Sequence, residues 1–200
     1  MFFSYAQLPL SHERGLSFLR IISGIRRGHK LFEFEGSDIR PTTDRVRESL
    51  FNLIQDFVDG AMVLDLFGGS GALSLEAISR GAKNSVICDI DLKSIELIKK
   101  NTKSLGFEDK LSINRISAED FIRTTNKQFD LIFLDPPYNK GFISPIISSI
   151  VENGLLNDEG IIVLESDNTD EHGEFSGLSV LKQRRYGRTF VTVYKRGDKI

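Results

Sequence analysis

A run of glycines between an apolar segment and a helical pattern constrains the fold most strongly. Residues 62–67 are apolar and strand-like, and Gly68, Gly69, Ser70 and Gly71 follow them before helical spacing resumes. Glycines permit a tight turn and let a ligand approach the main chain, and the N-terminus of the following helix favours an anionic group. The segment therefore predicts a strand–turn–helix unit with a ligand at its turn.

Strand-like and helical segments alternate after this turn. Strands are expected at 62–67, 85–90, 111–116, 129–134 and 161–165, and helices up to residue 80, at 92–105, shortly before 129 and at 141–152. Such alternation is typical of a parallel sheet with helices on both faces. Segments 178–186 and 189–195 alternate around Gly187 and predict an antiparallel hairpin at its edge. The predicted fold class is α/β, with a Rossmann-like, mostly parallel sheet.

Two elements are expected before the glycine-rich turn. Segments 19–23 and 30–34 predict the short strands of a small N-terminal β-hairpin. Thr42 and Thr43 then offer capping hydroxyls, and apolar residues recur at helical spacing until Gly60. We therefore expect a helix between residue 43 and Gly60.

The formal net charge of −2 hides an uneven distribution of charges. One cluster of basic residues lies near the N-terminus and another near the C-terminus, so the chain can present a basic face to a nucleic acid. The candidate residues for RNA binding are Arg20, Arg26, Arg27, Lys30, Arg184 and Arg185. Basic side chains that protect solvated edge strands from pairing are the alternative explanation.

Composition limits the other classes of protein. The single cysteine, Cys88, excludes an internal disulfide framework and a cysteine-based zinc cluster, and we expect no metal. No stretch approaches the roughly 18 uninterrupted apolar residues of a membrane span. The N-terminal segment makes a poor signal peptide. We therefore expect a cytoplasmic protein with no membrane partner.

Two acids end the first two strands of the predicted sheet, where ligands bind in such folds. Asp65 precedes the glycines, where it can meet a cationic amino group and would repel a phosphate. Asp89 closes the next strand, where an acid can accept both hydroxyls of a ribose. Asp91 is the alternative for that role, but it starts a predicted helix and suits capping better.

The third motif is Asp135-Pro136-Pro137-Tyr138, directly after segment 129–134. The prolines remove two main-chain donors and stiffen the turn, so carbonyl oxygens project without internal partners. Asp135 and the Pro136 carbonyl can then accept hydrogen bonds from an NH₂ group, and Tyr138 offers a ring for base stacking. Such acceptors stabilise the positive charge that develops when an aromatic amine attacks an electrophile.

These motifs together resemble the amino-methyltransferases of the Rossmann-like class. More narrowly, residues 19–195 resemble the bacterial small-subunit ribosomal RNA guanine-N2 methyltransferases, a family named for guanine 966 of 16S RNA. The resemblance rests on residues 20–24, 40–48 and 64–73, and the block at 40–48, Arg-Pro-Thr-Thr-Asp-Arg-Val-Arg-Glu, is its most specific part. Asp89 stands where glutamate is common, and a shorter carboxylate can still reach a ribose.

The resemblance implies S-adenosylmethionine as the cofactor and assigns roles around it. It implies that Asp65 and the glycines line the methionine end, that Asp89 holds the ribose, and that residues 118–119 lie beside the adenine. The expected cofactor-binding residues are Thr43, Arg45, Asp65, Phe67, Gly68, Gly69, Ser70, Gly71, Asp89, Ile90, Ala118 and Glu119. The expected catalytic residues are Asp135, Pro136, Pro137 and Tyr138. Simple capping and surface charge remain alternatives for Thr43 and Arg45.

The implied reaction is direct in-line methyl transfer to the N2 amino group of a guanine that has left its stack, with neither a metal nor a covalent intermediate. The implied partner is small-subunit ribosomal RNA within an assembling 30S particle, and the enzyme is expected to be a monomer. We expect residues 1–18 to be a disordered extension or the product of an upstream start, and in either case dispensable for activity. Residues 19–38 are then a hairpin appendage, and 39–200 the methyltransferase domain.

Other functions remain open at this point. A DNA adenine-N6 methyltransferase uses the same proline turn, although this chain is short and has no obvious recognition domain. A protein glutamine methyltransferase typically carries asparagine where Asp135 stands. A non-catalytic ribosome-assembly factor would not need the three acids of the motifs. An NAD-dependent dehydrogenase is disfavoured because the turn lacks the third glycine of dinucleotide binders.

Overall fold

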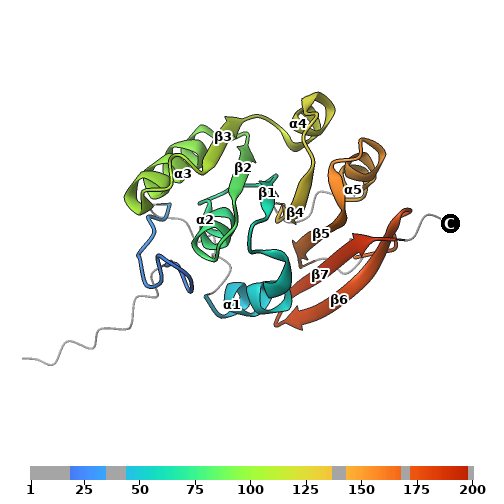
Figure 1. The fold of residues 1–200 in the computed structure, drawn as a ribbon, viewed down its shortest axis with the longest axis horizontal. Helices are drawn as coiled ribbons and strands as arrows, with labels where there is room; N and C mark the ends of the chain where they lie inside the picture. Colours follow the sequence, from blue (N-terminus) through green and yellow to red (C-terminus); the bar gives the residue numbers. More distant parts are fainter. Residues whose placement is uncertain (1–18, 35–43, 137–142, 168–171, 198–200) are drawn as a thin grey trace, which may run out of the picture.

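The computed structural model describes residues 19–34, 44–136, 143–167 and 172–197. The strands are β1 (Met62–Asp65), β2 (Asn84–Asp89), β3 (Leu111–Arg115), β4 (Phe129–Leu134), β5 (Leu156–Ser166), β6 (Leu178–Tyr186) and β7 (Thr189–Arg196). Within the described residues they form one seven-stranded sheet in the order β3-β2-β1-β4-β5-β7-β6 (Figure 1). The first five strands are parallel, and β7 is antiparallel to β5 and β6. The predicted fold class is therefore confirmed, with its C-terminal hairpin.

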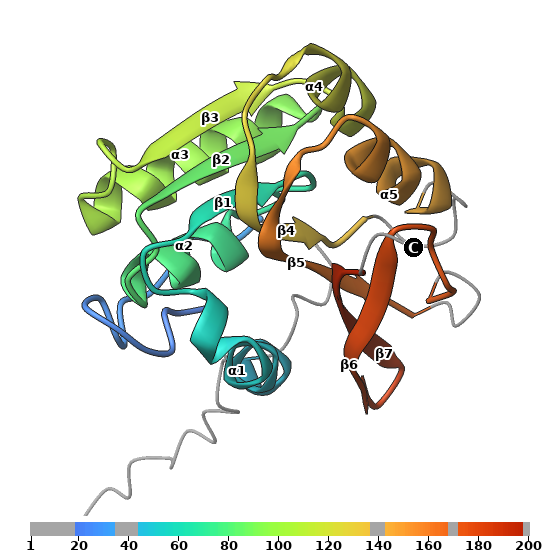
Figure 2. The same ribbon diagram turned by 45° about the vertical axis from the view of Figure 1, so that its right-hand side comes forward.

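Helices cover both faces of this sheet (Figure 2). The helices are α1 (Asp44–Leu53), a 3₁₀ turn η1 (Gln55–Phe57), α2 (Ala72–Ser79), α3 (Leu92–Leu105), α4 (Ala118–Thr124) and α5 (Ile143–Glu152). One apolar core lies between the sheet and α1 and α2, and the other lies under α4 and α5. None of the described helices is long and apolar enough to cross a membrane.

The parallel strands bring their carboxyl ends to one edge of the sheet. In register, Asp65 of β1 lies beside Phe133 of β4, which is followed two residues later by Asp135. The turn between β6 and β7 lies at the same edge, because Phe190 pairs with Ser166, the last residue of β5. The carboxyl edge therefore collects the motifs at 65–71, 89 and 135–136 and the C-terminal hairpin turn.

The N-terminal segment forms a hairpin-like loop without regular strands. A single antiparallel bridge joins Arg20 to Lys30, where two strands were expected. Polar groups of α2 hold this loop: buried Glu76 accepts from the backbone N–H groups of Ile22 (2.7 Å) and Ser23 (3.0 Å). The predicted antiparallel pairing is therefore confirmed at this one bridge. Beyond it, the main chain of the loop hydrogen-bonds to α2, and the two longer strands that were expected do not form within the described residues.

The helix expected up to Gly60 is shorter than its apolar spacing suggested. α1 ends at Leu53, Ile54 has φ −113°, and η1 then turns the chain towards β1. The apolar residue Phe57 still packs against the core of α1, so the spacing persists although the α-helix does not. Pro145, by contrast, occupies the first turn of α5 as expected, where its missing N–H costs nothing.

The glycines of the N-terminal loop give a matched test of how tightly it docks. Gly24 and Gly28 share φ +82°, but a Cβ on Gly24 would stand 1.8 Å from the Ser79 carbonyl oxygen, whereas one on Gly28 meets nothing within 4 Å. Gly28→Ala should lower the free energy of unfolding by about 1 kcal/mol through its backbone conformation. Gly24→Ala should cost about 3 kcal/mol or more, because backbone must move. Urea unfolding measures both, and equal losses would contradict the docked loop.

Candidate active site

Three carboxylates gather on one face of the sheet at its carboxyl edge. Asp65 ends β1, Asp135 follows β4, and Glu165 is the next-to-last residue of β5. Two positions before each of these acids lies an apolar residue of the core beneath α1 and α2. Because side chains alternate along a strand, all three acids point to that same face. Asp65 is 0% exposed and Glu165 2%. Such a concentration of buried negative charge favours a cationic ligand.

Asp65 is held by groups that orient its carboxylate. Its Oδ2 accepts from the Ser74 hydroxyl (3.0 Å), and its Oδ1 accepts from the Phe67 N–H (3.4 Å). The pKa of Asp65 is raised to about 6: burial is the largest cause and the charge of Asp89 adds to it, while both hydrogen bonds oppose the shift. Asp65 is therefore ionised at neutral pH, and its buried charge lowers the free energy of unfolding. A cation bound at the site would remove this destabilisation.

The glycine-rich turn is built from several main-chain contacts. Gly69 and Gly71 have φ +54° and +80°, a region that glycine adopts without strain. The Gly71 N–H donates to the Gly68 carbonyl (2.7 Å), and the Gly69 N–H donates to Asp89 Oδ2 (2.8 Å). A Cβ on Gly68 would stand 2.5 Å from Ile87 Cγ2, so this glycine permits close packing on β2. The turn is therefore fixed before any ligand arrives.

Residues expected beside a ribose and an adenine lie at the ends of β2 and β3. Asp89 Oδ1 accepts from the Asp91 N–H (2.9 Å), and Asp91 caps α3 through the Lys93 N–H (3.0 Å), which confirms its predicted capping role. Ile90 is 67% exposed, an unusual position for a large apolar side chain. Ala118 and Glu119 begin α4 beyond β3, the neighbouring strand. Their contacts with a cofactor remain predictions.

Asp135 is half-buried beside Pro136, which is buried. Burial, then the charge of Glu165, then that of Asp65, holds the pKa of Asp135 well above its usual range. A carboxyl group with a raised pKa binds a proton, or interacts with a nearby cation, more readily than an ordinary one. Pro137 and Tyr138, the rest of the motif, lie outside the described residues.

The sequence analysis missed a buried arginine that faces this acidic group. Arg47 of α1 is 1% exposed and donates to the Arg20 carbonyl and to Asp44 Oδ1 (3.0 Å). Burial lowers the pKa of Arg47, and the charges of Glu76, Asp44 and Glu165 oppose that shift. Its signal in the sequence was its spacing, three and four residues before Leu50 and Phe51, both buried. Arg47 is ion-paired with Asp44, and its positive charge also interacts with the charges of Glu76 and Glu165.

Thr43 and Arg45 were also expected to contact the cofactor. Arg45 is exposed at the start of α1, and Thr43 lies outside the described residues. A role for either in holding the cofactor remains a prediction.

The six candidate RNA-binding residues divide between two ends of the molecule. Arg184 and Arg185 lie exposed beside the β6–β7 turn, at the carboxyl edge, and Arg185 packs on the Phe190 ring (5.1 Å). Arg26 binds the Leu105 carbonyl at the far end of α3 (2.8 Å), a helix about 21 Å long. The remaining candidates, all exposed on the N-terminal loop, are Arg20, Arg27 and Lys30.

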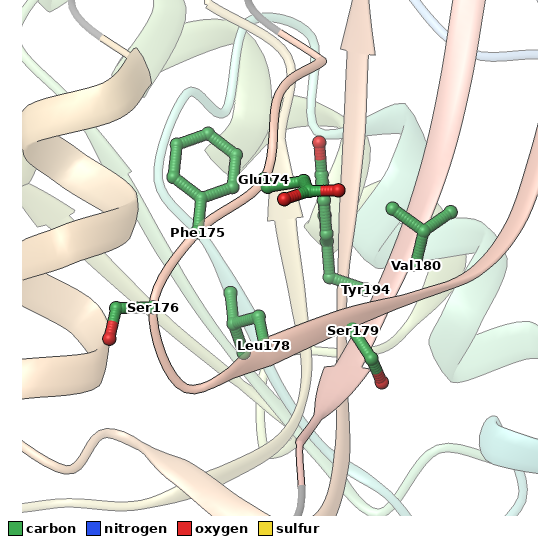
Figure 3. A pocket seen from close by; sticks show the side chains of 7 residues that line it. All are labelled: Glu174, Phe175, Ser176, Leu178, Ser179, Val180 and Tyr194. Carbon is green, nitrogen blue, oxygen red and sulfur yellow. The ribbon is translucent and has the colours of Figure 1, made fainter.

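A surface hollow of about 430 Å³ lies apart from these residues. Figure 3 shows Tyr194 and Phe175 among the side chains that line it, near the start of β6. Tyr194 belongs to the core under α5 and pairs with Ile162, four residues before the end of β5. The hollow is therefore on the opposite face from the carboxylates and is not part of this site.

Comparison with known proteins identifies relatives over most of the chain. The family model described as conserved hypothetical protein 95 matches residues 19–195. The candidate rRNA methyltransferase YlbH of Bacillus subtilis is 39% identical over 89% of this chain and 99% of its own length. The ribosomal RNA small subunit methyltransferase D of Escherichia coli is 37% identical over 76% of this chain and 77% of its own. The solved structure of the candidate methyltransferase yhhF of Escherichia coli has a TM-score of 0.81 and 33% identity over 90% of this chain and 98% of its own.

The raised pKa of Asp65 predicts a stability effect with a defined sign. Because the folded pKa of about 6 exceeds the unfolded value near 4, the favourable contribution of this group is complete below pH 4 and is lost as pH rises through 6. Asp65→Asn should therefore raise the free energy of unfolding by about 1–2 kcal/mol at pH 8 and leave it unchanged at pH 4.

Denaturant unfolding at both pH values measures this effect, with the exposed Glu108→Gln as control. A variant that is less stable than the native protein at pH 8 would contradict the assignment.

Proposed function

The chain belongs to the family described as conserved hypothetical protein 95, and on that premise we propose that it is an S-adenosylmethionine-dependent methyltransferase of small-subunit ribosomal RNA. Its target is the N2 amino group of a guanine, the one equivalent to guanine 966 of 16S RNA. The observation that carries the proposal is the convergence of Asp65, Asp89 and Asp135 at one edge of the sheet around a preformed glycine-rich turn. The match of residues 40–48 to the guanine-N2 family supports the choice of amino group.

The donor set fits the proposed cofactor. S-adenosylmethionine carries a sulfonium and an ammonium cation, and the buried carboxylates of the site favour positive charge. Asp65 would hold the ammonium end and Asp89 the ribose. Ile90, Ala118 and Glu119 would flank the adenine. When bound, the cofactor supplies an electrophilic methyl group.

The residues of the proline motif prepare the nucleophile. The Asp135 carboxylate and the Pro136 carbonyl accept hydrogen bonds from the guanine N2 amino group and stabilise the positive charge that develops on its nitrogen. The raised pKa of Asp135 suits it to take a proton once the nitrogen has become cationic. The base must leave its stack to reach this buried edge, and Pro137 and Tyr138 are proposed to enclose it.

RNA is proposed to meet the protein along its basic surfaces. Arg184 and Arg185 lie beside the reacting edge, and they would grip phosphates close to the target base. Arg20, Arg26, Arg27 and Lys30 would contact a more distant part of the RNA. We further propose that the enzyme acts in the cytoplasm, as a monomer, on an assembling 30S particle.

Methylation of isolated small subunits tests the function directly. Purified protein and labelled S-adenosylmethionine are incubated with subunits from cells that lack this activity, and the product nucleoside is identified by mass spectrometry. N2-methylguanosine at one position is the expected result. Label in N6-methyladenine of a DNA control, with none in RNA, would refute the choice of polymer.

Replacing the proposed proton acceptor separates chemistry from binding. Asp135→Ala should lower the turnover rate by about 10²–10³-fold, because one acceptor for developing charge is lost. Its Kd for S-adenosylmethionine should stay within about threefold, since Asp65 and Asp89 remain. Single-turnover assays and calorimetry measure the two quantities, and near-normal turnover would refute the role of Asp135.

The two basic surfaces should contribute unequally to RNA binding. Arg184→Ala combined with Arg185→Ala, both exposed beside the β6–β7 turn, should raise the KM for the subunit about tenfold or more. Arg27→Ala at the far end of the N-terminal loop should raise it less. Cofactor affinity should stay constant in all variants. A larger effect from Arg27 would reverse the proposed orientation of the RNA.

A further inference from the structure

A buried asparagine joins the N-terminal loop to the glycine-rich turn. Asn101 of α3 is 0% exposed. Its Oδ1 accepts from the Phe32 N–H (2.7 Å), and its Nδ2 donates to the Phe32 carbonyl (3.1 Å) and to the Ser70 carbonyl (3.0 Å). One amide group therefore binds both main-chain groups of one residue and the carbonyl of another, 38 positions apart in the chain.

The bond to Ser70 fixes a peptide plane at the centre of the turn. The same peptide bears the Gly71 N–H, which donates to the Gly68 carbonyl (2.7 Å), so the plane is held on both sides. Ile98, one helical turn before Asn101, lies where added Cβ atoms on Gly68 or Gly71 would touch it. α3 thus supports the glycine-rich turn through the apolar side chain of Ile98 and the polar side chain of Asn101.

Phe32 can act as an anchor because the loop that carries it is firmly docked. Glu76 holds the main chain of Ile22 and Ser23, and the Ser79 hydroxyl donates to the Ser23 carbonyl (2.7 Å). The Leu31 N–H donates to the Leu19 carbonyl (2.8 Å), next to Phe32. Leu19, Ile21 and Leu31 are buried in the core with α1 and α2.

We propose that Asn101 is a positioning residue for the cofactor, through which the docked N-terminal loop sets the orientation of the Ser70–Gly71 peptide. The loop, expected from sequence as an RNA-binding appendage, is then also a structural part of the cofactor site. The inference rests on the proposed binding of S-adenosylmethionine at this turn. Preorganisation of a binding loop improves affinity because the ligand need not order it.

Two substitutions at Asn101 test the role. Asn101→Ala removes all three hydrogen bonds, and Asn101→Asp keeps an acceptor for the Phe32 N–H but loses the donor to Ser70. Both should weaken S-adenosylmethionine binding about tenfold, which corresponds to about 1.4 kcal/mol. At saturating cofactor, kcat should remain within about twofold, because Asp135 is untouched.

Phe32→Ala is the matched control. It removes the ring, on which the Lys100 ammonium lies 3.7 Å from the centroid, but keeps the main-chain groups that bind Asn101. Its cofactor affinity should equal that of the native protein.

Calorimetry with S-adenosylmethionine, alongside thermal unfolding of each variant, measures these effects. A folded Asn101 variant with native affinity would overturn the positioning role while leaving the proposed function intact. A native protein that binds no S-adenosylmethionine would instead overturn the proposed function, and this role with it.

Discussion

Buried negative charge at the carboxyl edge of the sheet is the constraint on which the site depends. Parallel strands bring Asp65, Asp135 and Glu165 to one face. Burial raises the pKa of Asp65 and of Asp135, the charge of Asp89 adds to the first shift, and the charges of Glu165 and Asp65 add to the second. Such a group is tolerated in the folded protein because Ser74 orients Asp65 and Arg47 contributes opposing charge. The arrangement sacrifices stability in the free protein for affinity towards a cation, a common relation between stability and function.

The residues around these buried carboxylates are held rigidly by hydrogen bonds. The glycine-rich turn is held by Asp89 from β2, by its own Gly68–Gly71 bond and by Asn101 from α3. The N-terminal loop braces the same region through α2 and α3, far from the strands that carry the acids. The geometry of the proposed cofactor site therefore depends on several layers of the fold, and the N-terminal loop, proposed to contact RNA, is one of them.

Much of this could be predicted from local patterns. The strand–helix alternation predicted the sheet, and the position of Asp91 before a helix predicted its cap, because both depend on near neighbours in sequence. Arg47, Glu76 and Asn101 were not predicted, since a polar residue on a helix is usually solvated. Their partners on the N-terminal loop lie 27 to 69 positions away, and the docking of that loop brings them together. The end of α1 at Leu53, before Gly60, was likewise not predictable, because it depends on how η1 turns the chain towards β1.

The most direct measurement is the number of protons released when S-adenosylmethionine binds, obtained by calorimetry in buffers of different ionisation enthalpy. At pH 6, Asp65 is about half protonated, and a bound cation should lower its pKa and expel the proton. The account predicts release at pH 6 that fades by pH 8 and decreases in Asp65→Asn. Binding at pH 6 without proton release would contradict the charge-based account of the site.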